Sequence, residues 1–371
     1  MLSVRGRGHL IAFLGALVVI AGVLLLFMSA RTGLSGPGKG QPAVYGLVLP
    51  GTVDSSGWNK SMFEGVSRAV SSAGGRLLYA QGVKAGTGKA VEAVRTLIDR
   101  GASTVILGSR DYRDEVSEEI SKHPATDFVA FTDFALRRNL SSYWVRVYQI
   151  SYMAGFTAAM MSRTAVLGYV AGEPDSFVNR NINAFAMGAR DARADAKIKV
   201  VFTHDWESRA KGQEAASRLI DEGGAEVLSY LLYNDSVSQE ARRRKVRYVG
   251  FLEDPEKYDP GLMLGMINIS WEFLADVIIK HRISPVHPSK VRWYGIGENM
   301  VWLDERSPFL TTEVLNHIRS QEVSFQKGGE IFSGLIKDNL GQVRCKSGEV
   351  LSDRTLAEKV DWYAQGVEIL N

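Results

Sequence analysis

Side chains that could hold a small ligand follow directly after the predicted β-strands. They are mostly carboxylates, amides and aromatics, at residues 54–59, 109–111, 133–134, 205–206, 234–236 and 253–254. An aromatic ring offers a flat face on which a base can stack, worth roughly 1–3 kcal/mol per base, and carboxylates and amides accept hydrogen bonds from hydroxyl or ring N–H groups. Basic side chains and glycine-rich loops, which a phosphorylated ligand requires, are sparse there. The pattern favours a neutral, hydroxylated, ring-bearing ligand.

Each of these side chains also has a structural explanation. Asp54 and Asp235 stand just before predicted helices, where a carboxylate can cap the helix N-terminus. Phe63 and Phe185 fall on apolar helical faces, where core packing is the alternative to ligand contact. Trp58 and Trp206 follow predicted strands and have polar loop neighbours, which favours ligand contact for both.

Other kinds of site lack their motifs. The run 86–90, Gly-Thr-Gly-Lys-Ala, has Ala where a phosphate loop needs Ser or Thr. The single cysteine, Cys345, excludes an internal disulfide and a cysteine zinc site, and His204, His281 and His287 lack a third ligand at a suitable spacing. We therefore expect no cofactor and no metal. A net charge of only +3, from 44 basic and 41 acidic residues, provides no field for nonspecific nucleic-acid binding.

The chain of 371 residues is long enough for two domains. Short β-branched runs alternate with helical periodicity, which is typical of parallel sheets with crossover helices. One series of strands lies at 43–50, 76–80 and 104–107, and a second lies at 165–172, 198–204, 226–232 and 246–252. This predicts an α/β chain with two doubly wound parallel-sheet lobes. Residues 42–150 form lobe 1, with part of 262–285 crossing back to it, and 151–371 mainly form lobe 2.

The N-terminal segment predicts a membrane anchor. No charged residue occurs from Leu10 to Ala30, and a helix of that length rises roughly 30 Å, the thickness of a bilayer's hydrocarbon core. A cleaved signal peptide is the alternative, although its apolar region is usually shorter. With Arg5 and Arg7 before the segment, we expect a cytoplasmic N-terminus at 1–9, a transmembrane anchor or signal segment at 10–30 and a flexible stalk at 31–41.

A colinear set of short segments lies at 54–59, 63–65, 128–133, 145–148, 152–155, 167–172, 182–189, Trp206 and 234–236. In their order and spacing these segments resemble the basic membrane protein family of ABC-transporter substrate-binding proteins, which includes bacterial purine-nucleoside receptors. The resemblance extends from Tyr45 to Trp271 and more loosely to 361–363. It implies a type I periplasmic-binding-protein fold, in which two lobes joined by crossing strands close on a ligand.

The resemblance also implies roles for individual residues. Asp54 and Asp133 match aspartates that hydrogen-bond the nucleoside, and Phe63 and Trp206 match aromatics that sandwich its base. Two positions depart from the pattern. Leu252 stands where the family often has a carboxylate that holds the ribose, and Trp271 stands where the nucleoside receptors have lysine, although some branches of the family also have tryptophan there. The predicted ligand-binding residues are Asp54, Ser55, Trp58, Asn59, Phe63, Asp133, Phe185, Trp206, Asp235, Asp254 and Trp271.

The sequence as a whole predicts a solute-binding protein tethered to a bacterial plasma membrane, with its body extracytoplasmic. It captures a nucleoside or a similar neutral, ring-bearing solute and delivers it to an ABC permease, without covalent chemistry. Two alternatives belong to other classes. One is a ligand sensor that presents its closed form to a signalling partner, and the other is a hydrolase that uses Asp54 and Asp133 as a carboxylate pair.

Overall fold

The computed structural model describes residues 42–54, 57–131, 138–283 and 291–370. Residues from Val44 onward form one unit in their contacts. The predicted cytoplasmic N-terminus, anchor and stalk at residues 1–41 lie outside the described ranges. Within those ranges no helix has the length and apolar character needed to cross a bilayer.

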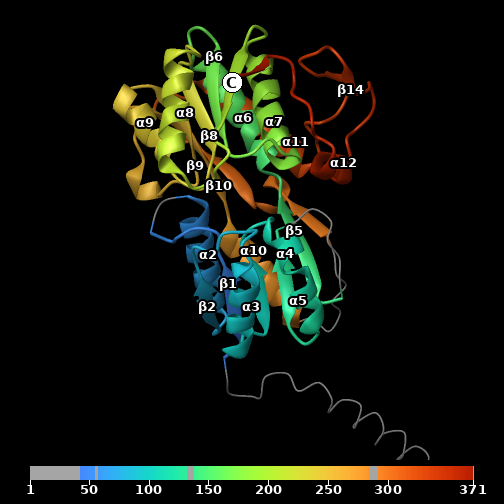
Figure 1. Cartoon of the computed structure of the whole chain (residues 1–371). Helices are drawn as coiled ribbons and strands as arrows, with labels where there is room; N and C mark the ends of the chain where they lie inside the picture. The colour runs from blue at the N-terminus through green and yellow to red at the C-terminus, as the bar shows by residue number, and fades with distance from the viewer. Residues whose placement is uncertain (1–41, 55–56, 132–137, 284–290, 371) are drawn as a thin grey trace, which may run out of the picture. The chain divides into compact units, whose positions relative to one another are not determined.

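The first lobe is built on a six-stranded parallel sheet in the order β11-β5-β4-β3-β1-β2. The strands are β1 (Val44–Val48), β2 (Arg76–Ala80), β3 (Thr104–Leu107), β4 (Asp127–Ala130), β5 (Leu140–Val145) and β11 (Val291–Tyr294). The helices are α2 (Trp58–Ser72), α3 (Lys89–Asp99), α4 (Tyr112–Glu115), α5 (Ser117–Lys122) and α10 (Trp271–Ile283), and Figure 1 shows them around this sheet. Because helices cover both of its faces, central strands such as β3 are buried along their whole length.

The second lobe is built on a seven-stranded sheet in the order β12-β10-β9-β8-β6-β7-β15. Its strands are β6 (Val166–Ala171), β7 (Lys197–Phe202), β8 (Val227–Leu231), β9 (Arg247–Phe251), β10 (Met263–Ile269), β12 (Val301–Asp304) and β15 (Val367–Ile369). All pairings are parallel except that of β12 with β10. The helices are α6 (Val147–Met160), α7 (Ser176–Ala192), α8 (Arg209–Asp221), α9 (Ser236–Arg244) and α11 (Thr312–Gln326), and short 3-10 turns lie at η1 (Pro255–Lys257) and η2 (Ile296–Glu298). The prediction of an α/β chain with parallel sheets is confirmed.

Two glycines explain why α6 and α7 pack so closely. A Cβ added at Gly155 of α6 would lie 1.9 Å from the carbonyl oxygen of Phe185, and one at Gly188 of α7 would lie 1.9 Å from that of Tyr152. No side chain larger than hydrogen fits at either position, so the two backbones touch directly. Phe185 is thereby fully buried, and its ring packs edge-on against Tyr169 of β6.

The chain after residue 333 folds back onto the second lobe. It forms the two-stranded pair β13 (Ile336–Lys337) and β14 (Val343–Cys345), then α12 (Asp353–Glu358), and ends in β15 beside β7. Buried asparagines of α7 hold it in place. Asn179 Nδ2 donates to the carbonyl of Val360 (2.9 Å), and Asn183 Nδ2 donates to that of Trp362 (3.0 Å).

The chain passes between the sheets at three places. It leaves β5 for α6 at Arg146, leaves β10 for α10 at Ser270, and leaves β11 for β12 through the segment that contains η2. Residues of α6 therefore belong to the second lobe, whereas α10 and β11 return to the first. These crossings are the part of the fold about which two such lobes can rotate.

Candidate functional site

The two lobes share a cavity of about 520 Å³ at the ends of their parallel strands. We call it the cleft cavity. It is lined by Pro50, Lys84, Ala85, Ser109 and Asp111 of the first lobe and by Glu173, His204, Asp205, Trp206, Glu207, Ser208 and Tyr233 of the second. Its position agrees with the rule that open parallel sheets bind ligands beyond the carboxyl ends of their strands.

Aromatic and acidic side chains give the cleft cavity its character. The rings of Trp206 and Tyr233 stack with their centroids 5.0 Å apart and an angle of 22° between their planes. Burial is the main cause that raises the pKa of the Tyr233 phenol, so this group stays a neutral hydrogen-bond donor. Asp111, Asp205 and Glu207 supply carboxylates nearby. A flat ring that carries N–H or hydroxyl groups matches such a surface.

Trp206 and Tyr233 form an aromatic wall of the cleft cavity, and behind it aromatic side chains of the protein fill the centre of the interface. The ring centroid of Trp58 in the first lobe lies 5.7 Å from that of Tyr233 in the second lobe. The Trp58 ring also packs edge-on against Trp271, with the centroids 4.7 Å apart. Phe131 packs edge-on against the other side of Trp271 at 5.3 Å. The inner pocket, whose lining includes Trp58, Phe131, Tyr233 and Arg110, holds only about 20 Å³ of free space. A nucleoside does not fit there unless the side chains move.

Polar contacts join the lobes around these rings. Asn59 Nδ2 donates to Glu207 Oε1 (3.2 Å), while the Asn59 amide oxygen accepts from the backbone N–H of Gly51 (3.2 Å). Arg110 pairs with Asp175, the N-cap residue of α7, at 3.3 Å. These contacts place the N-terminus of α2 and the end of β3 against the second lobe.

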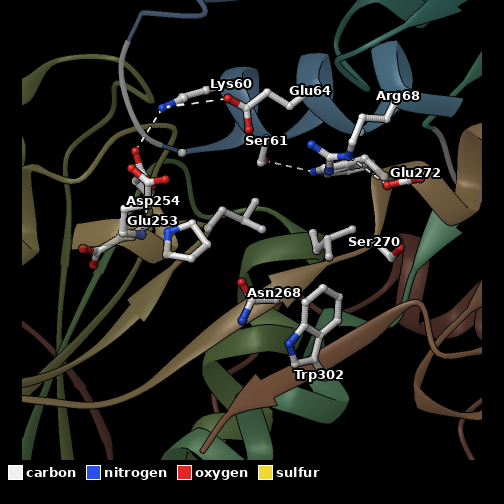
Figure 2. Close-up of a pocket in the computed structure, with 17 residues that line it drawn as sticks. Lys60, Ser61, Glu64, Arg68, Glu253, Asp254, Asn268, Ser270, Glu272 and Trp302 are labelled. Atoms are coloured by element: carbon white, nitrogen blue, oxygen red, sulfur yellow. Dashed lines mark hydrogen bonds and ion pairs between the residues drawn. The ribbon is translucent and has the colours of Figure 1, made fainter. Parts of the chain in front are cut away.

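A second cavity, of about 570 Å³, lies beside the β10–α10 crossing (Figure 2). We call it the crossing cavity. It is lined by one face of α2 (Gly57, Lys60, Ser61, Glu64, Gly65 and Arg68), by residues 252–256 and 268–272, and by Trp302 of β12. Lys60 and Asp254 form an ion pair of 3.0 Å across it, and the hydrogen bond to Asp254 is the main cause that raises the pKa of Lys60.

Several residues predicted from the sequence meet at the interface. Trp58, Asn59 and Trp206 lie between the lobes, with Trp206 half-buried in the cleft cavity. Trp271 is buried in the centre, where its Nε1 donates to Ser61 Oγ (3.1 Å). Asp54 is exposed and lines neither cavity. Ser55 and Asp133 lie outside the described residues.

Two predicted carboxylates are engaged in contacts of their own. Asp235 pairs with Arg209 at 2.6 Å and accepts from Gln239 Nε2. Asp254 caps η1 by accepting from the backbone N–H of Glu256, and its second oxygen pairs with Lys60 across the crossing cavity. Asp235 is thus tied into the second lobe, whereas Asp254 reaches the first.

Two predicted aromatics lie away from both cavities. Phe63 packs against Tyr79 of β2, with centroids 4.7 Å apart, on the side of α2 that borders another surface hollow. Phe185 is enclosed between α7 and β6. For both residues the structure shows the core or surface packing that was the alternative to ligand contact.

Tyr233, which lies two residues after β8 and forms half of the aromatic wall, was not predicted from the sequence. Glu207, the interlobe partner of Asn59, was also not predicted. The signal that could have found them is their position, because Tyr233 precedes the run 234–236 and Glu207 follows Trp206, both at strand ends. The predicted strand ends at Leu232 and the polar run begins at Asn234, so Tyr233 falls between the two segments and belongs to neither.

Comparison with known protein families identifies the chain. The family model for PnrA-like substrate-binding proteins of ABC transporters matches residues 43–333. The chain belongs to this family. Its members bind small solutes for ABC transporters.

Two known proteins are similar to this PnrA-like protein over most of its length. A purine-binding protein of Brucella abortus is 26% identical over 75% of this chain and 79% of its own length. The transcriptional activator protein Med of Bacillus subtilis is 22% identical over 85% of this chain and 98% of its own length. Among solved structures, a solute-binding protein of an ABC transporter system from Conexibacter woesei superposes with a TM-score of 0.63 at 17% identity, over 77% of this chain and 97% of the other. The last comparison shows the shared fold.

At the two positions that depart from the nucleoside receptors, this PnrA-like protein has buried apolar side chains. Leu252 is buried at the end of β9 with a φ of +51°. The neighbouring Glu253 does not face a ligand, because its carboxylate pairs with Arg242 (2.6 Å) and accepts from the Tyr230 hydroxyl (2.8 Å). Burial is the main cause that raises the pKa of Glu253, while Arg242 opposes the rise. The second position, Trp271, fills the centre of the interface.

Proposed function

We propose that this PnrA-like protein is a membrane-tethered, extracytoplasmic receptor that captures a nucleoside or a related neutral, ring-bearing solute for an ABC importer. The observation that carries the proposal is the stacked wall of Trp206 and Tyr233 beside carboxylates in a cavity of about 520 Å³. That volume falls within the range of roughly 300–1,000 Å³ that is usual for small-molecule sites. The purine-binding relative of Brucella abortus supports a ring-bearing ligand.

In this proposal the solute ring stacks on Trp206, and its N–H and hydroxyl groups donate to Asp111, Asp205 or Glu207. Asp54, Ser55 and Asp133 remain proposed contacts, as the family resemblance implies. The bound solute joins groups of both lobes, so it stabilises the closed arrangement that the importer recognises. Residues 10–30 hold the body at the membrane, with the stalk at 31–41 between them.

Thermal unfolding of the full-length chain tests this proposal. Adenosine and adenine are compared with glucose, and a ligand at a hundredfold its dissociation constant stabilises the fold by roughly 2.7 kcal/mol. We expect stabilisation by a purine compound, and we expect Trp206→Ala to weaken its binding by about tenfold or more, because stacking on that ring is lost. Tyr79→Ala, which alters an exposed aromatic outside the cavities, is the matched control. Stabilisation by glucose alone, or undiminished binding to Trp206→Ala, would overturn the proposal.

A second candidate function is sensing, and the similarity to the Bacillus subtilis activator favours it. In that case the closed form is presented to a signalling partner instead of a permease. Deleting the gene distinguishes the two functions. Loss of radiolabelled purine uptake indicates an importer receptor, whereas unchanged uptake with an altered transcriptional response to the purine indicates a sensor.

A further inference from the structure

The crossing cavity has a feature that its ion pairs do not explain. Asn268 of β10 lines it and is only 8% exposed. Its Nδ2 donates to the carbonyl of Met266 (2.9 Å), which fixes the orientation of the amide, since only the nitrogen can donate. Within the described part of the chain Asn268 Oδ1 accepts no hydrogen bond. This oxygen is not one of the fully buried polar atoms without a partner in the described residues, so it opens to the cavity, where a ligand or solvent can donate to it.

An exposed aromatic ring lies directly beside this oxygen. Asn268 and Trp302 are partners in the antiparallel pairing of β10 with β12, so their side chains stand next to each other on one face of the sheet. Figure 2 shows both below the face of α2 that carries Lys60, Glu64 and Arg68. Trp302 is 44% exposed, which is unusual for so large an apolar ring. An acceptor and an open aromatic face are thus offered to the same space.

The charges around the cavity select the class of ligand. Glu253 is neutralised by Arg242, as described above. The remaining lining carries the carboxylates of Glu64, Asp254, Glu256 and Glu272 against the cations of Lys60 and Arg68. Two of these carboxylates are paired closely, Asp254 with Lys60 and Glu272 with Arg68, whereas Glu64 lies 3.9 Å from Lys60. The cavity therefore keeps an excess of negative charge.

We propose that the crossing cavity binds a small organic cation, a ring or alkyl chain that bears a protonated amine. The ammonium donates to Asn268 Oδ1 in a cavity whose lining carries the carboxylates of Glu64, Asp254, Glu256 and Glu272, and the apolar part of the ligand covers the Trp302 ring, which also attracts the positive charge. The crossing cavity shares no lining residue with the cleft cavity that contains Trp206, although Leu252, Asp254 and Trp271, which stand at positions predicted to contact the solute, line it. The proposal rests on Asn268, Trp302 and the carboxylates of the crossing cavity alone.

The site spans both lobes, because α2 belongs to the first sheet while Asn268 and Trp302 belong to the second. A cation bound there contacts the β10–α10 crossing. It therefore favours the arrangement in which Lys60 and Asp254 meet, and acts on closure from a position outside the solute cavity.

Isothermal titration of the full-length chain with benzylamine tests the proposal. Benzyl alcohol, which has nearly the same shape without the charge, is the matched ligand control. We expect benzylamine to bind about tenfold more tightly than benzyl alcohol, and we expect Trp302→Ala and Glu64→Gln each to weaken benzylamine binding by several-fold. Both residues are partly exposed, so these variants fold.

Trp206→Ala provides the matched protein control, because it removes a comparable ring from the other cavity and leaves benzylamine affinity unchanged. Three results would each overturn the proposal. They are an absence of benzylamine binding, equal affinity for benzylamine and benzyl alcohol, and a Trp302→Ala variant that binds benzylamine as tightly as the parent. Loss of purine binding in Trp206→Ala has no bearing on this outcome, so the two proposals fail separately.

Discussion

At the scale of single residues, the absence of a side chain at Gly57 allows the two lobes to approach each other closely. It precedes α2 with φ 120° and ψ −158°, a combination that is essentially restricted to glycine. A Cβ at this position would lie 2.2 Å from the carbonyl oxygen of Tyr233 in the other lobe. Gly57→Ala therefore combines a local backbone strain of about 1–3 kcal/mol with a steric block to closure.

We expect the Gly57→Ala variant to fold and to show a larger radius of gyration than the parent in small-angle X-ray scattering. The control is Gly74→Ala, because Gly74 also has a positive φ, of +68°, but no atom lies within 4 Å of its added Cβ. The Gly74→Ala variant therefore has the backbone strain of an alanine at positive φ, but no steric clash with another residue. Identical scattering profiles for Gly57→Ala and the parent would show that this contact does not limit closure.

Sequence reasoning at this scale worked where the signal was local. The polar loop residues around Trp58 and Trp206 indicate that these rings are not core residues of one lobe, and both lie at the interface, while their contact with a ligand stays a prediction. Phe63 and Phe185 could not be assigned in that way. The face that a helical phenylalanine presents depends on what packs against it, here Tyr79 and Tyr169. No local pattern encodes those partners.

At the scale of elements, α7 carries polar residues that are buried because other parts of the chain pack on them. Its sequence carries Asn179, Arg180, Asn181 and Asn183, which would suit a solvent-facing side of a helix, yet all four are buried. Asn179, Arg180 and Asn183 donate to carbonyls of the chain beyond residue 333, which covers α7 and ends in β15. Asn181 instead accepts from Ser151 Oγ of α6. The alternation of strands and helices revealed both parallel sheets, but it could not reveal that this tail lies on α7.

Asn183 holds the tail from both sides. Its Nδ2 donates to the carbonyl of Trp362 (3.0 Å) and its Oδ1 accepts from the backbone N–H of Ala364 (2.8 Å). Asn183→Ala leaves two buried backbone groups without partners, so we expect the free energy of unfolding to fall by about 3 kcal/mol in guanidinium titration. Trypsin should then cut within 334–370 before it cuts elsewhere.

Asn339→Ala is the control for this prediction. Asn339 also bonds the tail, through Val367 (3.2 Å), but it is exposed, so its loss should cost less than about 1 kcal/mol. Equal stability of the two variants would mean that Asn183 does not fasten the tail.

At the scale of the whole molecule, the question is what joins the two lobes when no solute is bound. Two interlobe ion pairs, Lys60–Asp254 and Arg110–Asp175, are partly exposed, and such pairs contribute about 0–1 kcal/mol each. The aromatic contact of Trp58 with Tyr233 is different, because Trp58 is only 7% exposed and salt does not screen it. Sequence alone could not decide between them, since the partners of the two ion pairs lie 194 and 65 residues apart and no local pattern pairs them.

We infer that the aromatic contact dominates closure. The radius of gyration of the parent should therefore change little when NaCl is raised to about 1 M, a concentration that screens exposed pairs. Trp58→Ala, which removes a large buried ring from the interface, should open the lobes at low salt and increase the radius of gyration. Trp302→Ala is the control, because that ring is not part of the Trp58–Tyr233 contact. Opening of the parent by salt, with Trp58→Ala remaining closed, would instead assign closure to the ion pairs and make it sensitive to ionic strength.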